Sequence, residues 1–184
     1  EEQSTNGLEF NVFWDNRDYP HNPSRGNALI LDVTRDWGWA DSSASWTNVS
    51  AEYDHYVSLE IEGFRQSVLA LDFWTAYSPT WNVRPDGTIA HQPPAFSGAH
   101  LGGLFRMRAY PSQRFSDKAA VYYAAELRMI PRWNFFDSLP WLQEHVGVEW
   151  IQLVAFAEAG RVAPHYGIDD LHDDMRWDVG LGLR

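Results

Sequence analysis

The sequence predicts an all-β fold: an antiparallel transmembrane β-barrel, or part of one. Apolar and polar residues alternate with a period of two along seven segments, and this is the pattern of a strand with only one apolar face. The segments have 9 to 13 residues, whereas strands of soluble proteins have about 5 to 6 and membrane-crossing strands about 9 to 11. The face opposite the apolar one carries charged residues in each segment.

The first four segments span residues 7–15, 27–37, 47–59 and 67–77. Each is predicted to be a strand because apolar residues recur at every second position. Their apolar faces consist of Leu8, Phe10, Val12 and Trp14, then Leu29, Leu31 and Val33, then Val49, Ala51, Tyr53, Val57 and Leu59, then Leu69, Leu71, Phe73 and Tyr77.

Three further segments follow a long interruption, at residues 121–130, 148–160 and 176–184. Their apolar faces consist of Val121, Tyr123, Ala125, Leu127 and Met129, then Ile151, Leu153, Ala155, Ala157 and Ala159, then Trp177, Val179, Leu181 and Leu183.

A sheet with one apolar face and one charged face suits a barrel with lipid outside and water inside. The alternative is a soluble β-sandwich, in which each sheet has one wet face, although its strands are shorter. Aromatic residues near predicted strand ends are expected to form girdles at the membrane interface. They are Trp14, Trp37, Trp46, Tyr77 and Trp177.

The first connection, "NRDYPHNPSRG", is predicted to be a fixed turn. Asp15, Arg17 and Asp18 can hold a turn through side-chain hydrogen bonds. Pro23 restricts the backbone of the turn, and Gly26 permits conformations that other residues avoid. A catalytic role for the acidic and basic residues of this turn is the less favoured reading.

The longest connection covers residues 78–120 and contains a cluster of basic residues that includes Arg106, Arg108 and Arg114. Connections longer than about 15 residues often carry function. Residues 102–110 are also a candidate for an eighth strand, and residues 139–145 for a short helical turn.

Composition excludes several classes of function. The net charge of -11 argues against a nucleic-acid partner, because binding phosphates needs a basic surface. The absence of cysteine excludes disulfides, a thiol nucleophile and cysteine-bound zinc. No phosphate-binding loop or HExxH or GxSxG motif is present.

Two groups of residues suggest chemistry only weakly. Ser97 and His100 lie close in sequence and resemble half of a hydrolase site. The segment "HYGIDDLHDD", residues 165–174, is rich in histidine and aspartate and suggests either a divalent-cation site or a solvated surface loop, which we favour. We therefore expect no catalytic residue, no metal and no cofactor.

Four segments, in this order, resemble the barrel domain of BamA/TamA-type outer-membrane proteins, also called the bacterial surface antigen domain. They are "FWDNRDYPHNPSRGNALIL", "LGGLFRMRAYPSQRFSDKAAVYYAAELR", "LVAFAEAGRV" and "RWDVGLGLR". The second resembles the family's Gly-Gly pair, Arg-Gly-Tyr/Phe loop and Glu-Leu-Arg strand, and the third its Phe-x-Asp-x-Gly strand. The resemblance covers nearly the whole chain and is to the C-terminal portion of the barrel.

This resemblance implies that the long loop folds back into the barrel lumen. There, the arginine at the loop tip meets the acidic residue of the Phe-x-Asp-x-Gly strand. The positions that correspond are Arg108, Ala109 and Tyr110 in the loop and Phe156, Glu158 and Gly160 in the strand.

Two residues depart from the family pattern. Ala109 replaces the glycine, so a positive φ at this position becomes less favourable, and Glu158 replaces aspartate, which lengthens the acidic side chain by one methylene. Either change implies a shifted loop tip or a relaxed function.

The resemblance implies a non-enzymatic protein of the bacterial outer membrane that assists the insertion or translocation of other proteins. The alternatives are a membrane anchor or export barrel for an upstream domain such as a patatin-like phospholipase, and a passive pore. The expected partners are outer-membrane lipid and lipopolysaccharide, and client outer-membrane proteins.

Residues 1–184 are expected to form a single barrel domain that is incomplete. The family barrel needs sixteen strands, and an open edge cannot face lipid because its backbone N–H and C=O groups would be unpaired. Closure is therefore expected to need other barrel strands or a second copy of the chain.

Overall fold

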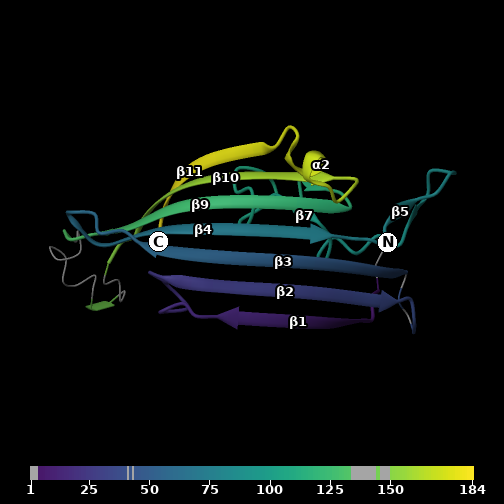
Figure 1. The fold of residues 1–184 in the computed structure, drawn as a ribbon, viewed down its shortest axis with the longest axis horizontal. Helices are drawn as coiled ribbons and strands as arrows, with labels where there is room; N and C mark the ends of the chain where they lie inside the picture. Colours follow the sequence, from purple (N-terminus) through teal and green to yellow (C-terminus); the bar gives the residue numbers. More distant parts are fainter. Residues whose placement is uncertain (1–3, 41, 43, 134–143, 146–149) are drawn as a thin grey trace.

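The computed structural model describes residues 4–40, 42, 44–133, 144–145 and 150–184. Its main feature is a seven-stranded antiparallel sheet, which confirms the predicted all-β class (Figure 1). The strands are β1 (Gly7–Asp15), β2 (Gly26–Trp37), β3 (Ser45–Ser58), β4 (Phe64–Tyr77), β5 (Asn82–Val83), β6 (Ile89–Ala90), β7 (His100–Leu101), β8 (Phe115–Ser116), β9 (Ala119–Pro131), β10 (Leu153–Ala163) and β11 (Arg176–Leu183).

All seven alternating segments lie in strands of this sheet. The largest difference concerns β10, which begins at Leu153, whereas the alternation predicted a strand over residues 148–160. Residues 146–149 lie outside the described part of the chain, and Gln152 continues the pairing through two backbone hydrogen bonds of 2.9 Å with Arg184.

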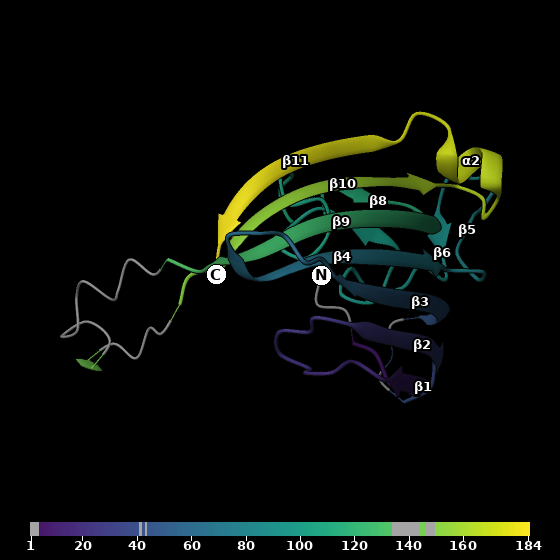
Figure 2. The same ribbon diagram turned by 60° about the vertical axis from the view of Figure 1, so that its left-hand side comes forward.

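The strands follow the order β1-β2-β3-β4-β9-β10-β11, so each strand of the large sheet pairs with its neighbour in sequence. Most of these paired strands are joined by a short connection. β4 and β9 also pair, although the long loop (residues 78–118) lies between them in sequence. Figure 2 shows that the sheet is curved. Within the described residues the sheet does not close, and β1 and β11 form its two edges.

The distribution of side chains is the reverse of that in a soluble protein. On the outer face, which carries Leu31, Leu71 and Val179, large apolar side chains are exposed, and the exposed fraction reaches 68% at Phe10 and 85% at Leu181. On the opposite, polar face, Glu158 is only 3% exposed and Asp178 only 7%. A soluble β-sandwich would bury the outer face, so the burial pattern favours the membrane alternative.

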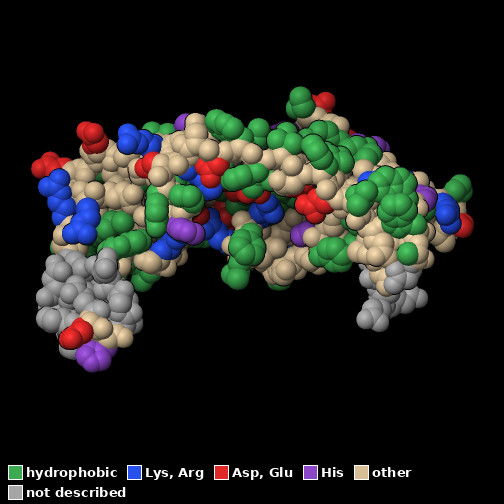
Figure 3. All heavy atoms as spheres, turned by 90° about the horizontal axis from the view of Figure 1, so that it is seen from below, with side chains coloured by type: hydrophobic (Ala, Val, Ile, Leu, Met, Phe, Trp, Pro, Cys, Tyr) green, Lys and Arg blue, Asp and Glu red, His purple; other side chains and the backbone are tan. Residues whose placement is uncertain are grey.

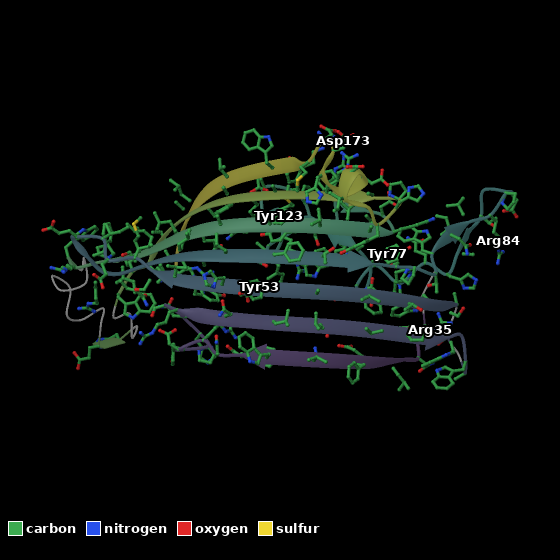
Figure 4. All side chains as sticks on the ribbon, viewed as in Figure 1. Arg35, Tyr53, Tyr77, Arg84, Tyr123 and Asp173 are labelled. Atoms are coloured by element: carbon green, nitrogen blue, oxygen red, sulfur yellow. The ribbon has the colours of Figure 1, made fainter. Side chains whose placement is uncertain are left out.

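The aromatic residues near strand ends lie mostly on the outer face. Figure 4 shows Tyr77 at the end of β4, and Tyr53 and Tyr123 farther along their strands. Trp14, Trp37 and Trp177 are 48%, 49% and 69% exposed. Trp46 is different because it lies on the polar face and is 4% exposed. Its predicted place in an interfacial girdle is therefore wrong.

The long loop packs against the polar face through the part around β7 and β8, which lies behind the sheet, whereas β5 extends beyond one end of the sheet (Figures 1 and 2). It contains two small hairpins, β5-β6 and β7-β8. Residues 102–110 form successive bends and turns, so the proposed eighth strand in this segment is wrong. Leu101, Met107 and Ala99 of the loop pack with Trp74 and Tyr122 of the sheet in one buried cluster.

Helical structure is sparse in the described residues. The helix α2 (Ile168–His172) connects β10 and β11. Of the predicted helical turn at residues 139–145, residues 144–145 are helical and the rest lies outside the described residues. No helix in the described part of the chain is long and apolar enough to cross a membrane.

Candidate functional site at the loop tip

The tip of the long loop (residues 102–114) is a compact turn. The backbone N–H of Gly102 donates to the carbonyl of Arg106 (3.0 Å), and the N–H of Gly103 donates to that of Tyr110 (3.1 Å). Tyr110 in turn donates to Met107 (3.0 Å). In the turn that these bonds form, Arg106 and Arg108 reach different parts of the polar face.

Arg108 is the basic residue that reaches β9 and β10. Its Nε donates to Oε1 of Glu158 (2.5 Å), and its Nη1 lies 2.6 Å from Oε1 of Glu126. Its backbone N–H also donates to Oε2 of Glu158 (2.7 Å). The structure thus brings together Arg108 and Glu158, the two residues that the resemblance had paired.

The electrostatics of Arg108 follow from these neighbours. Burial lowers the pKa of the guanidinium, but the carboxylates of Glu126 and Glu158 outweigh this effect, so the pKa is raised above its ordinary value. Arg108 therefore stays charged at every physiological pH, and its bonds to the two carboxylates are charge-assisted.

Glu158 accepts a third hydrogen bond, from the hydroxyl of Tyr122 on β9 (2.8 Å). Its side chain is fully buried, and a buried carboxylate needs such partners to offset the loss of hydration. The extra methylene relative to aspartate does not prevent contact with the loop, since the side chain reaches both the backbone and the guanidinium of Arg108.

Phe156 forms the floor under Arg108. The guanidinium carbon of Arg108 lies 3.7 Å from the centroid of the Phe156 ring, which is a cation–π arrangement. The ring itself lies over Gly180 of β11, where an added Cβ would come within 2.3 Å of the ring. Gly180 therefore leaves the space that the ring occupies.

Ala109 and Tyr110 complete the loop motif. The backbone N–H of Ala109 donates to Oδ2 of Asp178 (3.3 Å), and the Tyr110 ring packs edge-on against Phe115 (5.1 Å between centroids). Next to the motif, Met107 has a positive φ (59°), whereas the φ of Ala109 is not positive. The absence of glycine at position 109 therefore causes no backbone strain here.

Gly160 allows the loop to approach β10 closely. An added Cβ at Gly160 would lie 2.8 Å from Cδ1 of Leu101 and 3.3 Å from Sδ of Met107. Both of these loop side chains are fully buried. The glycine thus accommodates the apolar part of the loop, next to the ion pairs.

A charged hollow of about 610 Å³ lies between the loop tip and the polar face. Figure 3 shows acidic and basic side chains gathered in this central region. Three carboxylates in its wall, Glu52, Asp54 and Asp72, lie with one oxygen of each within 4.8 Å of the others. Among the described residues these are the ones that could hold a metal ion. The alternation placed them on one face, but only the strand register shows that they are adjacent.

The residues of the turn motif are linked by side-chain hydrogen bonds. Asp15 binds Nε and Nη2 of Arg17 (2.9 and 2.7 Å), and Asp18 accepts hydrogen bonds from the backbone N–H groups of Tyr19 and Ser24. Burial acts to raise the pKa of Asp18, but these bonds and others from Ser24 and Arg25 lower it to about 2. Pro23 is buried, and Gly26 has a φ of +103°.

This turn also makes contacts that the sequence did not reveal. The side chain of Asn22 donates to Gln66 (3.1 Å) and accepts from Gln152 (3.1 Å), which is 130 residues away. The turn therefore lies across one end of the polar face and connects β4 with the start of β10.

The two weaker candidate sites are not assembled into catalytic or ligand clusters by the contacts that the structure shows. Burial lowers the pKa of His100, and no hydrogen bond joins its side chain to Ser97 in the described part of the chain. In the segment of residues 165–174, His165 lies 3.5 Å from Asp170, and His172 bonds to Tyr123 (2.8 Å).

The family description that matches the chain is "Omp85 superfamily domain", and the match covers residues 1–184. A comparison with curated proteins gave no match.

Proposed function

The chain belongs to the Omp85 superfamily of outer-membrane proteins, and from this we propose that it acts in the manner of BamA and TamA, assisting other proteins to insert into or cross the outer membrane. The proposed activity is non-enzymatic. Its partners are outer-membrane lipid, lipopolysaccharide and client outer-membrane proteins.

The proposed mechanism uses the edge of a sheet. A strand edge presents unpaired backbone N–H and C=O groups, which an incoming strand can pair with. In lipid each unpaired group costs several kcal/mol, so an open edge strongly favours a client strand. The edges of the described sheet, β1 and β11, are proposed to pair in the membrane with further barrel strands or with a second copy.

The observation that carries the proposal is the position of the loop. Arg108 lies between Glu126 and Glu158, so the loop tip is held on the polar face next to β10 and β11. A loop held in this way would keep the adjacent strands in register while they exchange partners.

The proposal is tested by client assembly in cells that depend on the intact protein. We expect Arg108→Ala to reduce the yield of a folded, heat-modifiable client barrel at unchanged levels of the protein itself. Arg84→Ala is the matched control, because Arg84 is an exposed arginine of the same loop and lies far from the sheet (Figure 4). Equal client yields in the two variants would refute the role of the loop tip.

A passive pore is the second candidate, favoured by the charged hollow of about 610 Å³. A pore that the loop plugs would conduct more ions in planar bilayers after Arg108→Ala. Unchanged conductance, together with normal client assembly by the native protein, would exclude this candidate. The third candidate is an anchor for an upstream domain. It is distinguished from the other two by identifying what precedes the barrel in the intact protein, since a phospholipase domain there would favour the anchor.

A further inference from the structure

Arg106 makes a second set of contacts with the sheet, on the opposite side of the loop tip from those of Arg108. Its Nη2 pairs with Oε2 of Glu52 on β3. Its guanidinium carbon lies 4.2 Å from the centroid of the Trp74 ring on β4. A cation over an indole face is the most favourable arrangement of this kind, so Arg106 has both an ionic and an aromatic partner.

The backbone of the tip explains why two arginines so close in sequence diverge. Met107 stands between them with a φ of 59° and a fully buried side chain. The left-handed conformation turns the chain, and the buried methionine holds the turn against the sheet. Arg106 therefore extends toward β3 and β4, while Arg108 extends toward β9 and β10.

These four strands are neighbours in the sheet, in the order β3-β4-β9-β10. The loop tip is consequently attached at two places that are separated across the sheet. Arg108 pairs with residues of β9 and β10, so without Arg106 the apolar packing of Leu101 and Met107 is what would hold the tip against β4.

The surroundings of Arg106 make its charge necessary. Glu52 shares the polar face with Asp54 and Asp72, and the three carboxylates lie close together. A cation next to them offsets their mutual repulsion. The side chains of Arg106 and Glu52 are 27% and 28% exposed, so water screens their attraction less than it would on an open surface.

We propose that Arg106 is a second positioning residue, which with Glu52 and Trp74 holds the loop tip on β3 and β4 independently of the Arg108 contacts. This inference rests on the proposed function only for the importance of the loop. The attachment itself can be measured without any client protein.

The experiment uses a cysteine reporter in the intact protein, reconstituted in outer-membrane lipid vesicles. The chain contains no cysteine, so a single substitution gives a unique label site. Ala76 on β4 is 1% exposed and packs in the same cluster as Leu101 and Met107 of the loop. In Ala76→Cys, the rate of reaction with a bulky water-soluble maleimide therefore measures how often the loop leaves β4.

We expect the Arg106→Ala change to raise this rate about threefold to tenfold, as for the loss of one partly shielded, charge-assisted hydrogen bond. Glu52→Gln should raise it similarly, because it removes the same ion pair with little change in shape. Arg84→Ala, made in the same Ala76→Cys background, should leave the rate unchanged.

A charge exchange separates pairing from general damage. In the Ala76→Cys background, Arg106→Glu alone should make the cysteine react rapidly with the maleimide. Combining Arg106→Glu with Glu52→Arg should make this reaction slower than in Arg106→Glu alone. The inference is overturned if Arg106→Ala labels at the rate of Arg84→Ala, or if the exchange does not slow labelling. If Arg106→Ala does not give a heat-modifiable folded barrel, an unchanged rate in Glu52→Gln overturns it instead.

The outcome is independent of the proposed function. Failure of the intact protein to assemble clients would refute that function and leave the labelling rates as they are. Equal labelling rates with normal client assembly would refute only the role of Arg106.

Discussion

At the scale of single residues, Arg108 concentrates more interactions than its neighbours in the loop tip. It pairs with Glu126 and Glu158 and covers Phe156. Removing it leaves the fully buried carboxylate of Glu158 without its cation, which is more costly than the loss of a surface pair.

We therefore expect Arg108→Ala to lower the free energy of unfolding by about 2 to 4 kcal/mol, somewhat less than for a fully buried pair because the arginine side chain is 25% exposed. Urea titration of the barrel in lipid vesicles measures this. Arg84→Ala serves as the control, and a loss in Arg108→Ala no larger than in this control would contradict the account.

Asp18 gives a prediction about pH. Its pKa in the folded turn is about 2, against an ordinary value of 3.8, so the unfolded chain binds the proton more tightly and the group stabilises the fold when ionised. This stabilisation is complete above about pH 4 and is lost as the pH falls toward 2.

Asp18→Asn should therefore be less stable than the native protein at pH 7, and the difference should shrink as the pH falls from about 4 to 2. Unfolding free energies of the two proteins measured across this range provide the test. A difference that is constant with pH would show that ionisation of Asp18 does not hold the turn.

Residue-scale features divide into those that the sequence predicts and those that it does not. Side-chain bonds between near neighbours, such as Asp15 with Arg17, follow from local turn chemistry. The bonds of Glu158 to Tyr122 and of Ala109 to Asp178 depend on strand register and loop path. Alternation gives the face of a residue but not its partner on the next strand.

At the scale of elements, the strands were predictable because a period of two is a local property of the sequence. The seven segments were found, and errors were confined to a few residues at their ends, where the alternation and the strand pairing do not stop at the same residue. The loop was harder to predict, because its path depends on contacts with the sheet. The left-handed turn at Met107 and the contacts of Arg106 with Glu52 and Trp74 have no local sequence signal.

The two faces of a strand predict opposite responses to a charge. Leu31 is on the outer face of β2 and 39% exposed, whereas its neighbour Ile30 faces the polar side and pairs with Glu52. Leu31→Lys should cost about 2 to 4 kcal/mol in lipid, as for a charge near the bilayer midplane.

Ile30→Lys is the matched control and should cost less, since the new ammonium would lie near an acidic side chain in water. Both values come from unfolding titrations in lipid vesicles. Similar costs for the two variants would mean that the faces do not differ in their surroundings.

At the scale of the whole molecule, the sheet has an apolar outer face and a polar face covered by a loop. The two faces both result from the alternation of apolar and polar residues along each strand. The polar face carries carboxylates that a soluble protein would place in bulk water. Here Glu52 pairs with Arg106, and Glu126 pairs with both Arg108 and Arg128. This arrangement requires lipid on one side and water on the other, which agrees with membership of the Omp85 superfamily.

The most direct test of this arrangement is a spin-label scan along β2 (Gly26–Trp37) in lipid vesicles, one cysteine at a time. The scan compares collision rates with oxygen, which concentrates in lipid, and with a water-soluble nickel complex. We predict a period of two, with oxygen favoured at Leu29, Leu31 and Val33 and nickel favoured at Ile30, Asp32 and Thr34. Low collision rates with both reagents at the outer positions would indicate a closed protein core and would contradict the account.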